Sequence, residues 1–191
     1  MANKDAAFGF KPTRHLTGGK IRAEEYTIAA NHGTSIFNGQ VVEAVAGGGI
    51  EQAAAGDTQQ LGVFGGCFFT DPSSSKPTFK AFYPASTNAA DIEAFVIDDP
   101  NVIYEIQCDA AFPVADLFGN FDIVYTSSGS TVTGISGAEL DVTTGATNTN
   151  LPIKAIDISQ DPENSDVSSD ATNVQVVIQN HIFGVKGAGL A

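Results

Sequence analysis

The sequence has no tryptophan, one methionine and two cysteines among its 191 residues. It also lacks the run of about 18 apolar residues that a membrane span needs and the leading apolar stretch of a secretory signal. We therefore expect synthesis in the cytoplasm and no membrane partner. Cys67 and Cys108 both stand within apolar stretches, and thiols in that setting are expected to be free and buried.

Positive charge is scarce, and it is concentrated at one end of the chain. Five of the nine Lys and Arg residues, but only one of the 22 acidic residues, fall within residues 1–22. The remaining four cations face 21 acids, so the body of the protein should repel nucleic acid and anionic membranes. We call residues 1–22 the leader, and we interpret it as an arm that docks on a partner.

The residue patterns of common enzyme and metal sites are missing. The three histidines, His15, His32 and His181, form no HxH or HExxH pattern, and the cysteines form no CxxC pattern. Gly18-Gly19-Lys20 lacks the earlier glycine of a phosphate loop. The acids between 161 and 170 lack calcium-loop spacing. We therefore predict a protein that is not an enzyme and that has no metal and no cofactor.

Short segments with a period of two predict a mainly β fold, as a small β-barrel or sandwich. Residues 174–183 give the clearest alternation, and a single helical turn is predicted at 113–119, between a proline and a glycine. The other predicted strands are Tyr26–Ala30, Gln40–Val45, Leu61–Phe69, Thr78–Tyr83, Ile92–Ile97, Val102–Cys108, Phe121–Tyr125 and Ile153–Ile158.

Gly, Ser, Thr and Asn dominate the segments between these strands. Ser127–Asn150 is predicted to be an exposed hairpin or loop, Gln160–Asn173 an acidic loop, and Glu51–Ala55 a loop or turn. We divide the chain into an extended arm (1–22), a Gly-rich β-barrel lobe (23–85), a second β lobe (86–185) and a frayed tail (186–191). One continuous barrel is the alternative, because no linker separates the lobes.

The leader combines aromatic residues, glycine and cations with a proline that favours extended backbone. Aromatic and arginine side chains concentrate binding energy at protein interfaces. The alternative is a first strand that packs on its own barrel. The predicted partner-binding residues are Lys4, Phe8, Phe10, Lys11, Pro12, Arg14, His15, Lys20 and Arg22.

One stretch resembles a known family. Residues 36–42 (IFNGQVV), the Gly/Ala-rich turn 47–57 (GGGIEQAAAGD) and residues 61–64 (LGVF) resemble the small-barrel core of tailed-bacteriophage head decoration (cement) proteins. The opening residues 1–12 (MANKDAAFGFKP) look like the start of structural proteins of marine and cyanobacterial phages. The likeness covers about a third of the chain. The chain carries some hundred extra residues after Pro84 compared with the smallest members of the family.

This resemblance implies a non-enzymatic virion protein that is made in the host cytoplasm and sits on the outer capsid surface. Its partner would be the major capsid protein, whose neighbouring subunits it fastens, and it would be a homo-oligomer, with a trimer favoured. The alternative is a receptor- or glycan-binding tail or fibre module that presents the Ser127–Asn150 loop to sugar. That loop has no aromatic residue of its own, and only Tyr125 lies beside it.

Overall fold

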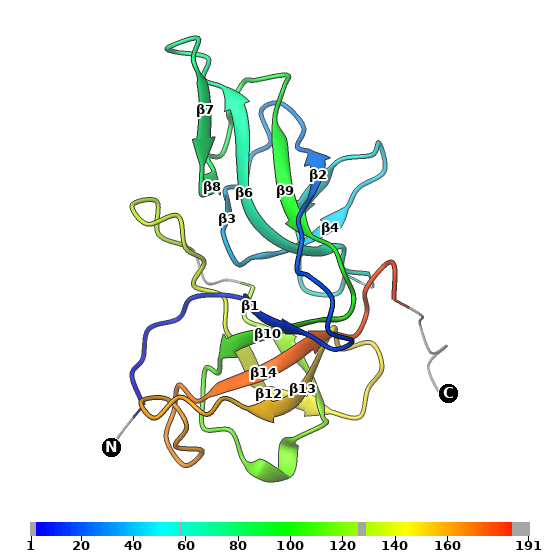
Figure 1. The fold of residues 1–191 in the computed structure, drawn as a ribbon, viewed down its shortest axis with the longest axis vertical. Helices are drawn as coiled ribbons and strands as arrows, with labels where there is room; N and C mark the ends of the chain where they lie inside the picture. Colours follow the sequence, from blue (N-terminus) through cyan, green and yellow to red (C-terminus); the bar gives the residue numbers. More distant parts are fainter. Residues whose placement is uncertain (1–2, 58, 126–128, 185–191) are drawn as a thin grey trace.

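The structure is a computed structural model that describes residues 3–57, 59–125 and 129–184. It is mainly β, as predicted, with two large antiparallel sheets that lie one above the other in Figure 1. The described part of the chain contains one short 3-10 helix, η1 (Val114–Asp116), inside the predicted helical turn. The frayed tail predicted at residues 186–191 lies outside the described residues.

The first sheet, sheet A, has six strands and forms the lower half of Figure 1. Each neighbouring pair is antiparallel. In spatial order the strands are β1 (Lys11–His15), β10 (Val102–Gln107), β14 (Asn173–Ile178), β13 (Ile153–Ile158), β11 (Asn120–Ile123) and β12 (Leu140–Ala146).

The second sheet, sheet B, forms the upper half of the molecule (Figure 1). Its path is β2 (Glu24–Thr27), β9 (Glu93–Ile97), β6 (Gly62–Thr70), β4 (Val41–Ala44) and β5 (Ile50–Gln52), and β7 (Pro77–Lys80) pairs with β6 off this path. A separate two-stranded ladder joins β3 (Ile36–Phe37) to β8 (Phe82–Tyr83).

Both sheets curl without closing into a barrel. A single bridge from Thr27 to Gly49 brings the two edges of sheet B together. In sheet A, a bridge from Cys108 to Leu140 links the end of β10 to the edge strand β12. Neither contact extends into a ladder among the described residues. Each sheet therefore wraps partway around its own hydrophobic core.

Strands β4 and β6 contribute to both cores. Successive side chains of a strand point to opposite faces, so Val41 enters the core of sheet A while Val42 enters that of sheet B. On β6, Val63 and Phe64 divide in the same way. Gly62 is needed beside them, because a Cβ there would overlap the Ile97 carbonyl oxygen. These two strands join the sheets into one packed body.

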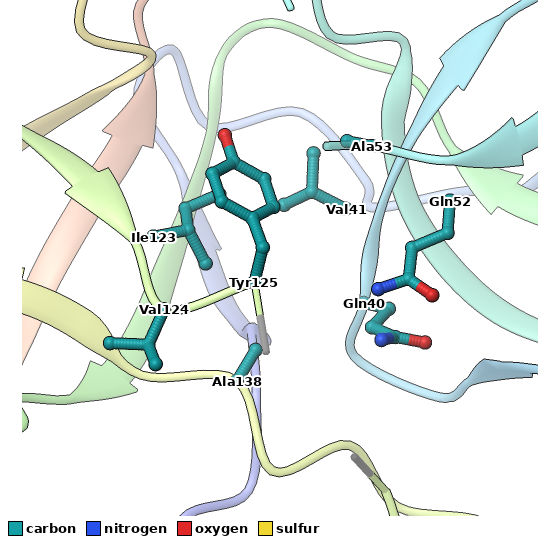
Figure 2. A pocket seen from close by; sticks show the side chains of 8 residues that line it. All are labelled: Gln40, Val41, Gln52, Ala53, Ile123, Val124, Tyr125 and Ala138. Atoms are coloured by element: carbon teal, nitrogen blue, oxygen red, sulfur yellow. The ribbon is translucent and has the colours of Figure 1, made fainter. Parts of the chain in front are cut away.

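A small cavity marks this junction in Figure 2, where Tyr125 and Ile123 face Val41 and Ala53 across the space. Its volume is about 10 Å³, which holds one water molecule at most. Burial, followed by the nearby Asp122 carboxylate, raises the pKa of the Tyr125 hydroxyl. The junction is a packed contact between the sheets and offers no room for a larger ligand.

Several predicted boundaries differ from the structure. The strand predicted at 174–183 ends at Ile178, because the next residues turn away and the Gln179 amide donates to the Pro152 carbonyl. The segment Thr78–Tyr83 is two strands, β7 and β8, with different partners. Glu51 and Gln52 lie in β5, where a loop or turn was predicted, and Ser127–Asn150 contains strand β12.

Each sheet combines strands from more than one of the predicted divisions of the chain. Strand β9 follows residue 85 in the chain but pairs with β2 and β6 in sheet B. Strand β1 lies within the leader but pairs with β10 in sheet A.

The predicted free thiols are confirmed, since Cys67 and Cys108 are both unpaired and fully buried.

Replacing Phe10 should test how firmly the leader belongs to the fold. Phe10 is 1% exposed in the core of sheet A and meets Tyr104 edge to face, with 6.0 Å between ring centroids. We expect Phe10→Ala to lower the free energy of unfolding by about 3 kcal/mol, measured by urea denaturation. The exposed neighbour Lys11 is the control, and Lys11→Ala should cost less than about 1 kcal/mol. Equal losses would contradict this assignment.

A carboxylate cluster on the β4–β5 hairpin gives the stability a pH dependence. Glu43 lies opposite Glu51 in register. Burial, followed by the charge of Asp57 and a hydrogen bond with it, raises the pKa of Glu43 from 4.5 to about 7. The folded protein therefore holds this proton more tightly than the unfolded chain does. Its stabilising contribution is present below pH 4.5 and is lost as the pH rises through about 7.

Glu43→Gln should remove that dependence, because the amide carries no proton to lose. We expect the melting temperature of the variant, relative to the unaltered protein, to be higher at pH 8 than at pH 5, as measured by calorimetry. Glu163→Gln, at an exposed loop position, is the matched control and should show no such change. If Glu43→Gln shifts the melting temperature equally at both pH values, the raised pKa of Glu43 does not govern this pH dependence.

Candidate partner-binding surface

Side-chain amides hold the first part of the leader against sheet A. The Lys4 carbonyl accepts hydrogen bonds from Gln107 Nε2 at 2.9 Å and from Asn164 Nδ2 at 2.8 Å. The Ala6 amide donates to Gln107 Oε1 at 2.8 Å. Asn3 Nδ2 donates to the Asp166 carbonyl in the acidic loop. Residues 3–6 are thus ordered, and the residues that hold them lie more than 100 positions away in the sequence.

The leader next crosses the turn before β4, where glycines allow the two backbones to approach closely. Gly9 has a φ of 70°, and a Cβ on it would lie 2.6 Å from the Gly39 carbonyl oxygen. That oxygen accepts a hydrogen bond of 2.8 Å from the Phe10 amide. The alternation of glycine with aromatic residues therefore serves this crossing, and the Phe10 side chain enters the protein's own core.

Strand β1 follows as an exposed edge of sheet A. Pro12 is tolerated there because an edge strand need not use every amide. The register with β10 shifts between Pro12 and Arg14, and Thr13 Oγ1 donates to the Ile103 carbonyl at 3.0 Å. A proline, a bulge and charged side chains are features that keep an edge strand from pairing with another chain.

His15 organises the turn at the end of β1. Its Nδ1 accepts hydrogen bonds from the amides of Thr17 and Gly19, at 3.1 and 3.2 Å. These contacts place the remaining ring proton on Nε2, which donates to Asp99 Oδ2 at 2.8 Å. Burial acts to raise the pKa of Asp99, but hydrogen bonds from Asn101 and His15 outweigh it and lower that pKa. The His15 side chain is only 7% exposed.

The five leader cations, by contrast, all reach the surface. Lys11 is 65% exposed while it pairs with Glu105 at 3.4 Å, and Arg22 is 73% exposed while it pairs with Glu24 at 3.0 Å. Arg14 donates to Gln175 Oε1 at 3.0 Å. Exposed pairs of this kind contribute little to stability. Lys11 and Arg14 are held on strand β1, and the exposed side chains of all five cations can be reached by a partner.

The nine predicted partner-binding residues thus fall into three groups. Phe10 and the His15 side chain are buried, and they position the leader. Phe8 and Pro12 are half-buried, and the Lys11 ammonium lies over the Phe8 ring at 6.0 Å. The exposed group consists of Lys4, Lys11, Arg14, Lys20 and Arg22. We call this last group the cationic rim.

A second hollow lies between β7–β8 and the described part of the Ser127–Asn150 loop. It has a volume of about 320 Å³, is largely open to solvent and is lined by Lys80, Ala81, Phe82 and residues 131–134. One face of Phe82 stacks on Phe37, with ring centroids 5.3 Å apart. The Lys80 ammonium lies 5.9 Å from the Phe82 ring centroid. The fold therefore brings to this loop an aromatic ring that its own sequence lacks.

No group of three or more His, Cys, Asp or Glu side chains suited to holding a metal ion occurs within residues 3–57, 59–125 and 129–184. None of the helices in those ranges has the length and apolar character that a membrane crossing requires. Comparison with known proteins gives no match to a family model, a curated protein or a solved structure.

Removing the His15 ring should loosen the turn that ends β1. In His15→Ala the Thr17 and Gly19 amides lose their acceptor, so we expect faster hydrogen exchange at both amides. We also expect a loss of about 1–2 kcal/mol in the free energy of unfolding. Arg14→Ala, next to it but exposed, should leave exchange at both amides unchanged. Unaltered protection in His15→Ala would show that the ring does not hold the turn.

Proposed function

We propose that this protein is a structural virion protein of a tailed bacteriophage. In this proposal it binds the outer surface of the capsid, fastens neighbouring subunits of the major capsid protein and carries out no catalysis. The sequence resemblance to decoration proteins suggests this class. The observation that carries the proposal is the cationic rim, two of whose members, Lys11 and Arg14, lie on an edge strand of an otherwise acidic body.

The rigid support is what makes this surface suited to binding. Long Lys and Arg side chains on a mobile arm lose conformational freedom when they dock, whereas a backbone that is already ordered has less to lose. Hydrogen bonds to Gln107 and Asn164, together with the ladder to β10, provide that order. The cationic rim would meet an acidic groove on the capsid protein. A binder that contacts only the assembled shell would shift assembly toward it.

Charge removal can test the rim without disturbing the fold. Among the residues that the structure describes, Lys4, Arg14 and Lys20 have no salt-bridge partner. Changing all three to Gln should weaken co-sedimentation with capsids of the encoding phage about tenfold, since three exposed pairs at about 0.5 kcal/mol each sum to about that ratio. The matched control changes Lys76, Lys80 and Lys154 to Gln, which removes the same charge outside the leader.

The outcomes separate the two parts of the proposal. Equal weakening by both triple variants would show that overall charge, rather than the leader, governs binding. Failure of the unaltered protein to co-sediment, or its absence from purified virions by electron microscopy, would overturn the capsid assignment itself. Thermal melts of each variant show whether the fold is intact.

A glycan-binding tail or fibre module is the second candidate, and one observation favours it. The hollow beside Phe82 brings an aromatic ring together with the hydroxyls of Thr131 and Thr133, a combination that sugar sites use. The Lys80 ammonium near that ring would have to move for a sugar to stack there. Binding on a glycan array that is lost in Phe82→Ala would support this candidate in place of capsid binding.

A further inference from the structure

The outer face of sheet B carries a patch of phenylalanines. In antiparallel pairs, directly opposed residues share a face. One row across the strands therefore contains Thr27, Glu93, Phe68 and Phe79, and the adjacent row contains Glu25, Phe95 and Gly66. Phe79 is 59% exposed and Phe68 is 38% exposed. We call Phe68, Phe79 and Phe95 the aromatic patch.

Gly66 forms the floor of this patch. It has a φ of 135°, at a shift in the β6–β9 register. A Cβ on Gly66 would lie 2.7 Å from Phe79 Cζ, so the Phe79 ring rests directly over the glycine. From there it contacts Phe95, with 6.2 Å between ring centroids. The glycine thus lets the ring lie across the strand and present its other face outward.

The charges beside the patch indicate the chemistry of its partner. The two charged positions in these rows are Glu93 and Glu25, which are both exposed carboxylates. An outward aromatic face attracts Arg and Lys through its negative quadrupole, and the carboxylates can pair with the same cations. The net charge of −13 adds a long-range attraction for cations. A face-to-face contact between two copies would instead bring like charges together.

We propose that the aromatic patch binds an extended, Arg- or Lys-bearing segment of a partner protein, with the cations placed between the rings and Glu93 and Glu25. The inference rests on the proposed function, because a protein that fastens neighbouring subunits needs a second contact surface. The cationic rim would bind one subunit, and the aromatic patch would bind a basic segment of the next. The two surfaces have opposite charge, so each selects a different chemistry.

The test uses the full chain and a defined probe, a fluorescein-labelled nonapeptide of alternating Arg and Thr. Fluorescence anisotropy at physiological salt should show saturable binding by the unaltered protein. Phe79→Ser leaves the net charge unchanged and should weaken binding at least tenfold, and Phe79→Leu, which keeps an apolar side chain without a ring, should also weaken it. Glu93→Gln should weaken binding and reduce its dependence on salt.

Matched controls separate the patch from general attraction to an acidic protein. Phe118→Ser removes another exposed phenylalanine, which is 71% exposed at the far end of sheet A. Glu163→Gln removes an exposed carboxylate in the acidic loop. Neither should change the affinity. A peptide with Glu in place of Arg should not bind.

Three results would overturn the proposal. The first is binding that does not saturate, and the second is equal binding by Phe79→Ser and Phe118→Ser. The third is self-association of the protein in sedimentation equilibrium that Phe79→Ser abolishes, which would make a second copy the occupant. Because neither capsids nor the leader enter this assay, its failure would leave the proposed capsid function standing. A loss of capsid binding alone would likewise leave the patch in place.

Discussion

The whole structure depends on two short segments, Val41–Val42 of β4 and Val63–Phe64 of β6, in which both faces of the strand are buried. Val41 and Val63 are opposite one another and enter the core of sheet A, while Val42 and Phe64 enter that of sheet B. Strand segments that are buried on both faces need tight packing on both sides, and Gly62 provides it where the Ile97 carbonyl approaches. Two curled sheets that would otherwise be separate therefore share one interior, and surfaces on either sheet keep fixed relative positions.

The leader depends on that shared interior for its shape. It supplies Phe10 to the core of sheet A and an edge strand to the sheet. The ladder with β10 fixes the backbone of Lys11 and Arg14. Its composition therefore serves two purposes, because the proline, bulge and charges that could bind a partner also protect an exposed strand edge. Phe10 and the His15 side chain are buried, so they serve the fold. The five cations are exposed, so they are available to a partner.

The proposed contacts use opposite charges on the two sheets. The cationic rim includes Lys11 and Arg14 on the edge strand of sheet A, and the aromatic patch with its glutamates lies on the outer face of sheet B. A rigid body with two such surfaces can hold two neighbours at a set distance, which is what fastening requires. The acidic remainder keeps the protein soluble and adds to the attraction for a basic segment.

Local patterns were enough to predict the strands that alternate cleanly, such as Ile153–Ile158, and also the helical turn, the two buried thiols and the mainly β class. They failed for β5, a short segment between Gly- and Ala-rich flanks, and they gave β12, which is rich in Thr, only as part of a hairpin or loop. Both segments are strands because β4 and β11 lie beside them. The sequence by itself determined which residues could bind, through charge and aromatic content. Only the tertiary structure decided that Phe10 is core while Phe79 is surface, because burial depends on pairings between residues far apart in the chain.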